Sequence, residues 1–166
     1  MNDQVILQIK GLRLESIAGN VIVDNVDLNL NKGEVLGLIG ESGAGKSTIG
    51  LSSMSYARAG VHIAAGEVIL GGVNIRALDA EGRRSVRGKR IAYIAQSASA
   101  AFNPVHTLMD QVCEAPLIHK LMTRQEAEAW ARQLFTSLDL PDPQNFGARY
   151  PHQVSGGQLQ RAMAAM

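Results

Sequence analysis

The chain has 166 residues, of which 46% are hydrophobic and 19% are charged, and its formal net charge is +1. These values exclude an intrinsically disordered chain, which would combine low hydrophobicity with a large charge imbalance, and the length suits one domain with its own core. The balanced charge argues against a surface that binds nucleic acid or anionic lipid over its whole extent. Cys113 is the single cysteine, so no internal disulfide forms.

The sequence carries no targeting signal that we recognise. No stretch has the roughly 18 consecutive apolar residues of a membrane-spanning helix. The first residues lack a basic segment followed by an apolar one, so we expect no secretory signal peptide. We therefore expect a cytoplasmic protein.

The first third of the chain has the pattern of β-strands. Apolar residues alternate with others at 5–9 and at 26–30, which predicts strands buried on one face. The run 34–39 is apolar on both faces and predicts a buried strand within a parallel sheet. This strand is expected to end at Gly40.

The next part mixes helix and strand. Residues 46–58 have helical composition, with a stop at Gly60. Residues 67–75 predict a hairpin that turns at two glycines. Residues 91–95 predict another short buried strand, which Gln96 follows directly.

From Thr107 onward the pattern is helical. Thr123 and Glu126 form a predicted capping box, and the apolar residues of 127–138 repeat at helical spacing, with Trp130 expected in the core. Ser155 and Gln158 form a second box, before apolar residues that share one helical face: Leu159, Ala162, Met163 and Met166. The chain ends without a C-cap signal, so we expect that it stops within this helix.

The clearest functional motif is a phosphate-binding loop. Eight consecutive residues match the pattern G-x-x-x-x-G-K-[ST] between an expected strand and an expected helix: Gly40, Glu41, Ser42, Gly43, Ala44, Gly45, Lys46 and Ser47. Glycines let the backbone N–H groups approach the β-phosphate, and the positive end of the helix adds a favourable field. Lys46 is expected to reach the β- and γ-phosphates, and the Ser47 hydroxyl to bind Mg²⁺. With Thr48, these residues form the predicted nucleotide site.

A second motif has the properties of an anion site. Five residues closely resemble the LSGGQ signature of ABC-type ATPases, with Val in place of Leu: Val154, Ser155, Gly156, Gly157 and Gln158. The resemblance implies that this site faces the γ-phosphate held by a partner subunit, so that ATP lies between two chains. An ordinary capping box is the alternative reading.

Gln96 follows an expected strand, where the ABC family keeps a glutamine that contacts Mg²⁺ and water and links the site to the membrane partner. A solvated glutamine at a strand end is the alternative. Because three motifs occur in the right order, the chain resembles an ABC ATP-binding subunit.

Three segments further resemble the oligopeptide, dipeptide and nickel importer branch of this family: 40–43, 101–107 and 150–161. The resemblance implies an α/β fold, in which a P-loop NTPase core with an antiparallel β layer (about 1–96) precedes a helical subdomain with the signature (about 97–166). It implies ATP and Mg²⁺ as cofactors. It also implies as partners a second ATP-binding subunit, two membrane permeases on the cytoplasmic face of the inner membrane and, indirectly, an external solute-binding protein. The permeases and the binding protein would select the solute.

Two departures from the family stand out. Near Ile17 the family offers an aromatic side chain to adenine, and this chain has none. The strand that ends in an Mg²⁺-binding Asp and a general-base Glu also has no counterpart, since four apolar residues precede neither Asp79 nor Asp139. We therefore expect an N-terminal fragment that binds ATP at most and hydrolyses it negligibly.

Other interpretations stay open. A soluble ABC-type ATPase that acts on nucleic acid or ribosomes is the rival, although we expect no nucleic-acid partner, and an inert gene fragment is the third reading. A basic cluster fits a solvated face, with contact to a permease or nucleic acid as the alternative: Arg83, Arg84, Arg87, Lys89 and Arg90.

Overall fold

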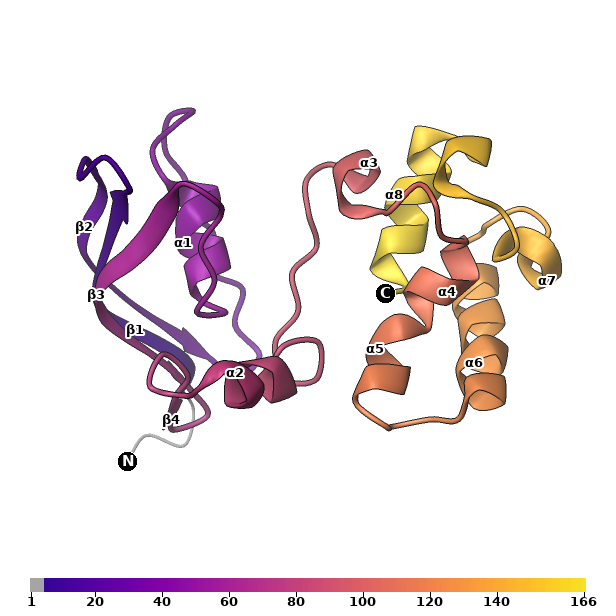
Figure 1. Cartoon of the computed structure of the whole chain (residues 1–166), viewed down its shortest axis with the longest axis horizontal. Helices are drawn as coiled ribbons and strands as arrows, with labels where there is room; N and C mark the ends of the chain where they lie inside the picture. Colours follow the sequence, from indigo (N-terminus) through magenta and orange to yellow (C-terminus); the bar gives the residue numbers. More distant parts are fainter. Residues whose placement is uncertain (1–4) are drawn as a thin grey trace. The chain divides into compact units, whose positions relative to one another are not determined.

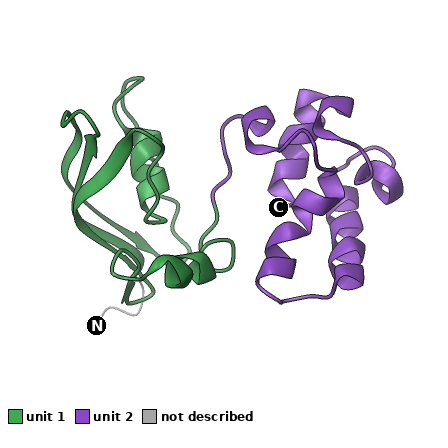
Figure 2. Ribbon diagram, viewed as in Figure 1, with its two compact units in different colours: residues 1–92 green, residues 93–166 purple. Residues whose placement is uncertain are grey.

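The computed structural model describes residues 5–166, and the chain divides into two compact units, 1–92 and 93–166 (Figure 2). Each unit has its own cluster of buried apolar side chains. Residues 1–4, on which the expectation of no signal peptide partly rests, lie outside the described residues. Among the described helices, none is long and apolar enough to cross a membrane.

Unit 1 is built on an antiparallel sheet with the strand order β2-β1-β3-β4 (Figure 1). Its strands are β1 (Val5–Ser16), β2 (Val21–Asn31), β3 (Val61–Leu70) and β4 (Val73–Asn74). The alternation in the sequence predicted the first two strands, and both extend further than predicted. The predicted hairpin is also confirmed, because Leu70 pairs with Val73 across the two glycines.

One face of this sheet forms the core of unit 1. Alternate residues of β1 and β3 are buried together with residues of neighbouring segments: Leu7, Ile9, Leu12, Leu14, Val68 and Ile75. Gly66 is needed where β3 passes β1, because a Cβ atom there would lie 2.6 Å from the carbonyl oxygens of Lys10 and Gly11. The antiparallel layer expected from the sequence is therefore a packed element of the structure.

Two helices complete unit 1: α1 (Lys46–Ser52) and α2 (Ala80–Val86). The predicted helix over 46–58 is too long. Ser55 has a left-handed backbone with φ of 54°, and the N–H of Tyr56 donates to Leu51 O at 3.3 Å. This bond closes the last turn and directs the chain away from the helix axis.

The two predicted buried strands do not form. Residues 34–39 pair with no strand in the described part of the chain, and Val35 and Ile39 are 96% and 97% exposed. Of 91–95, only Ile91 makes a bridge, with Arg87. A β-strand forms only where a neighbouring strand supplies partners for its backbone N–H and C=O groups. The four strands described here pair only with one another in antiparallel fashion, so these apolar runs have no partner strand.

Unit 2 is helical. Its elements are α3 (Ala98–Ala101), α4 (Leu108–Val112), α5 (Glu114–Ile118), α6 (Arg124–Ser137), α7 (Pro143–Phe146), the 3₁₀ helix η1 (Pro151–Gln153) and α8 (Gly156–Ala164). Both predicted capping boxes are present, at Thr123 and at Ser155. At the centre of the core, the rings of Phe135 and Phe146 meet edge to face, with centroids 5.2 Å apart.

The prediction that Trp130 lies in the core is wrong, since its side chain is 51% exposed. Residues spaced by four on α6 face the core instead: Ala127, Ala131 and Phe135. Trp130 precedes Ala131 by one position and is therefore rotated by about 100° from that face. Met166, expected on the apolar face of the last helix, follows the end of α8 and is 47% exposed.

Candidate nucleotide-binding site

The loop before α1 has the backbone that its glycines permit. Gly43 and Gly45 have φ of 86° and 80°, in the left-handed region that favours glycine. Gly45 is buried against β2, where an added Cβ would lie 2.8 Å from Cγ2 of Val23. A glycine is therefore required at this position for both conformation and space.

Lys46 folds back over the loop that precedes it. Its Nζ donates to the carbonyl oxygens of Gly40 and Glu41, at 2.7 and 2.5 Å. These bonds hold the ammonium group at the mouth of the loop, immediately beside the exposed residues 40–44.

The first turn of α1 offers further donors. Ile49 N–H donates to Gly45 O at 2.9 Å, which closes the first helical turn. The N–H groups before Ile49 are those that a helix start leaves without intrahelical acceptors, and they belong to Lys46, Ser47 and Thr48. The Ser47 side chain is exposed. An ammonium, a hydroxyl and backbone N–H groups form a donor set that fits a triphosphate and its Mg²⁺.

The C-terminal part of α1 anchors the helix. Leu51 and Ser52 are buried, and Ser52 Oγ donates to Thr48 O at 2.7 Å. This bond satisfies the hydroxyl within the core.

The predicted signature lies at the start of α8. Gln158 N–H donates to Ser155 Oγ at 3.3 Å, and Ser155 N–H donates to Gln158 Oε1 at 3.0 Å. Gly156 and Gly157 are exposed, and a Cβ at either position would meet nothing within 4 Å. Packing within the chain therefore does not require these glycines, and the capping box leaves the N-terminal face of α8 accessible.

Gln96 lies at an exposed bend two residues before α3. Ala98 and Phe102, which follow it, belong to the same buried cluster as Leu159 and Met163 of α8. The structure therefore places the Gln96 segment and the signature helix in one unit. The phosphate-binding loop belongs to the other unit, 1–92.

The alternative carboxylates have structural roles. Asp79 caps α2, accepting a bond from Gly82 N–H at 2.7 Å. Asp139 follows α6 with a left-handed backbone, and its carbonyl accepts a bond from Arg161 at 2.6 Å. Neither residue ends a strand. Ile17, where an aromatic group was sought, is 82% exposed at the turn after β1.

Part of the basic cluster binds backbone carbonyls. Arg83 donates to Leu78 O at 2.5 Å and to Arg76 O at 3.3 Å. Arg87 donates to Met54 O and Ser55 O. The expectation of a wholly solvated face is therefore wrong for these two guanidinium groups, whereas the other three members are exposed. Sequence gives no signal for this role, because the carbonyl acceptors can come from any residue type.

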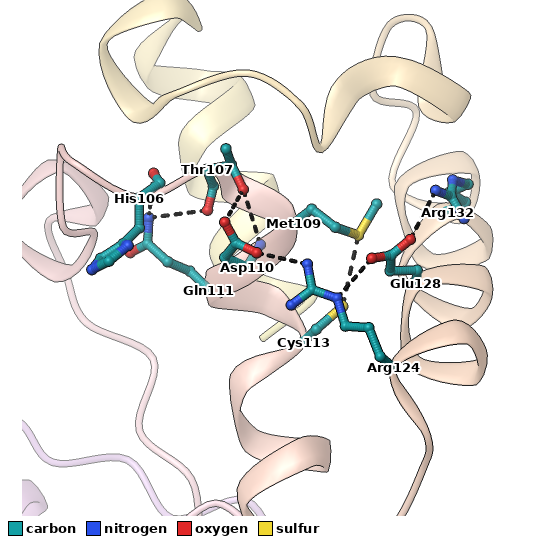
Figure 3. Close-up of polar contacts among 9 residues, drawn as sticks. All are labelled: His106, Thr107, Met109, Asp110, Gln111, Cys113, Arg124, Glu128 and Arg132. Carbon is teal, nitrogen blue, oxygen red and sulfur yellow. Dashed lines mark hydrogen bonds and ion pairs between the residues drawn. The ribbon is translucent and has the colours of Figure 1, made fainter.

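A polar network that no sequence pattern predicted lies beside α4 (Figure 3). Thr107 Oγ1 and Arg124 each donate to Asp110, both at 2.6 Å, and Arg124 also donates to Glu128. The Thr107 hydroxyl, followed by Arg124, lowers the pKa of Asp110, and Arg124 lowers the pKa of Glu128. Burial raises the pKa of the Cys113 thiol, so this cysteine is kept protonated.

Proteins of similar sequence include ATP-binding proteins, as expected for a phosphate-binding loop. A putative peptide import ATP-binding protein of Brucella melitensis is 40% identical over 175 residues, which cover 100% of this chain and 52% of that protein. The glutathione import ATP-binding protein GsiA of Salmonella typhimurium is 36% identical over 100% of this chain and 28% of its own length. The chain thus spans about half the length of its Brucella relative.

Solved structures share the fold. The ATP-binding cassette MJ0796, in a dimeric post-hydrolysis state bound to ADP and Pi, matches with a TM-score of 0.79 at 24% identity, over 96% of this chain and 67% of that one. CbiO1 of Clostridium perfringens, part of the transporter complex cbiONQ, matches with a TM-score of 0.71 at 18% identity, over 98% and 60%. The family model described as ABC transporter matches residues 23–166. The chain therefore belongs to the ABC transporter family, with the α/β fold of its ATPases.

Proposed function

We propose that this chain is the nucleotide-binding part of a subunit that energises the import of peptides, or of a related small solute such as nickel, through an ABC transporter. One observation carries the nucleotide site: the ammonium of Lys46 lies over a loop of left-handed glycines at the start of α1. The names of the Brucella and Salmonella relatives support the import function.

The proposed ligand is ATP with Mg²⁺. When ATP binds, Lys46 exchanges its two carbonyl acceptors for phosphate oxygens, and the N–H groups of the loop and of the first turn of α1 donate to the β-phosphate. Ser47 would supply a hydroxyl ligand to Mg²⁺, and Gln96 is proposed as a further ligand that would also position water. The metal would neutralise phosphate charge.

The signature has a different proposed role. Ser155, Gly156, Gly157 and Gln158 would complete the nucleotide site of a second ATP-binding subunit, because their N–H groups lie at an accessible helix start. The assembled protein would sit on the cytoplasmic face of the membrane, bound to two permeases that receive solute from an external binding protein.

The first test is a titration of the 166-residue chain with MgATP. Binding at one hundred times Kd stabilises the fold by about 2.7 kcal/mol, which a thermal shift detects. Lys46→Ala removes the ammonium and lowers the affinity at least about tenfold, because charge-assisted bonds to phosphate are lost. Lys32→Ala, which removes an exposed lysine in the turn after β2, serves as the matched control.

The titration and the search for bound partners distinguish three hypotheses: an importer subunit, a soluble ATPase and an inert fragment. No stabilisation at millimolar MgATP contradicts the proposal and supports an inert fragment. Isolation of the protein from its source with permeases supports import. Salt-sensitive binding to DNA or RNA, without permeases, supports the soluble ATPase instead.

A further inference from the structure

Arg87 binds the C-terminal end of α1, the helix that follows the phosphate-binding loop. It follows α2 directly, and its side chain reaches the segment after α1. There Nε donates to Met54 O at 3.0 Å, and a terminal nitrogen donates to Ser55 O at 2.6 Å. The guanidinium carbon also lies 5.6 Å from the centre of the Tyr56 ring.

These carbonyls belong to the C-terminal end of α1. Tyr56 N–H donates to Leu51 O and Ser55 N–H donates to Ser52 O, so the carbonyls of Met54 and Ser55 lie just beyond the last closed turn. A cation near this end also complements the negative pole of the helix dipole. Burial, followed by the charge of Arg83, lowers the pKa of Arg87, which indicates that the guanidinium is partly withdrawn from water.

The helix depends on such anchors. It has seven residues, too few for a stable isolated helix. Its first residues are Lys46 and Ser47, the proposed ligands of phosphate and Mg²⁺, and its last turn lies roughly 10 Å away along the axis. A shift of the C-terminal end therefore tilts the axis and moves the donors at the N-terminal end.

We propose that Arg87 is a positioning residue for nucleotide binding, which holds α1 so that Lys46 and Ser47 are aimed at the phosphates. This inference rests on the proposed function. Arg87 lies at the opposite end of the helix from the phosphates, so it acts through α1 and touches no ligand.

The test compares Arg87→Met with Arg84→Met. Methionine keeps an unbranched apolar side chain and removes the donors and the charge. Arg84 is exposed on α2, the helix that Arg87 directly follows, so its variant matches the loss of charge and controls for long-range attraction of ATP. We expect Arg87→Met to weaken MgATP binding about tenfold and Arg84→Met to leave it near the wild-type value.

Hydrogen exchange separates positioning from general loss of stability. In Arg87→Met, the amides of 49–52, which are the ones that donate within α1, should exchange faster, while those of β1 and β3 keep the wild-type rate. Arg87→Lys, which retains a charged donor for one carbonyl, should recover part of the affinity.

Each outcome decides a different question. If the wild-type chain fails to bind MgATP, the proposed function falls. If the wild type binds and Arg87→Met binds equally well, or if its exchange rises equally in β1 and β3, the positioning role is wrong. If Arg87→Met does not fold, Arg87→Lys decides: weaker binding with faster exchange confined to α1 supports the role, and wild-type binding with wild-type exchange contradicts it.

Discussion

At the scale of single residues, Gln111 shows how one buried amide holds a loop. Its Oε1 accepts a bond from Asn103 N–H at 2.8 Å, and its Nε2 donates to Asn103 O at 3.0 Å. The same Nε2 donates to His106 O at 3.0 Å (Figure 3). The side chain is 8% exposed. The loop 103–107 is therefore fixed from within, although Val105 at its tip is 72% exposed.

Replacing this amide should be costly. We expect Gln111→Leu to lower the free energy of unfolding by about 2–4 kcal/mol, because it leaves several partly buried backbone groups without partners. Urea denaturation followed by circular dichroism measures this change. Gln133→Leu, at an exposed position of α6, is the matched control and should change stability by less than about 0.5 kcal/mol. Equal effects of the two variants would show that the bonds of Gln111 contribute little.

The sequence could identify the residues whose roles depend on a short motif with fixed spacing. Lys46 and Ser47 follow a glycine-rich loop with fixed spacing, and Ser155 stands three positions before Gln158. Arg87 and Gln111 instead donate to backbone carbonyls, which every residue type has. The carbonyl of Met54 is also distant from Arg87 in the sequence. Their roles became visible only when the fold brought donor and acceptor together.

Helices and strands also differ in how far a local pattern predicts them. The capping boxes of α6 and α8 were predicted correctly because each depends on residues three positions apart. Residues 34–39 have the composition of a buried strand, but pairing requires neighbours that this apolar run cannot specify by itself. Within the described chain the run forms no strand, and Leu36 and Leu38 line a pocket together with residues of β1, β2 and α1.

The link between α4 and α6 should make unit 2 sensitive to acid. Arg124 of α6 donates to Asp110 of α4 and to Glu128 of its own helix, and the pKa values of both carboxyls are lowered in the folded chain. A lowered pKa stabilises the fold above the carboxyl's ordinary value, about 4, and this contribution is lost as the pH falls through the folded value.

We therefore expect stability to fall between about pH 5 and pH 3, with these exposed pairs contributing about 1 kcal/mol or less. Arg124→Met should make the dependence on pH shallower over this range, because the cation that favours both carboxylates is absent. Lys120→Met, which removes another exposed cation of unit 2, should leave the slope unchanged. Urea unfolding at several pH values measures the slope, and an unaltered slope in Arg124→Met would exclude this link as its source.

At the scale of the whole molecule, the motif order predicted the family, and the matched family model and shared fold confirm it. The antiparallel layer was implied by the family resemblance, and the helices of unit 2 were predicted from the helical spacing of apolar residues and from capping boxes. The predicted boundary near residue 96 stays a prediction about domains, while the structure divides into 1–92 and 93–166. The parallel strands predicted at 34–39 and 91–95 do not form, and the four described strands pair only with one another.

We expect the 166-residue chain to bind MgATP and to release no phosphate in the steady state, because hydrolysis needs a carboxylate that orients water and helps to hold the metal. Asp79 caps α2 and Asp139 follows the end of α6, so neither residue ends a strand. Phosphate release at saturating MgATP measures turnover, with Lys46→Ala as the background. Turnover that disappears in Lys46→Ala would show that a group other than these carboxylates activates water, and would overturn the assignment of this chain as a binding unit alone.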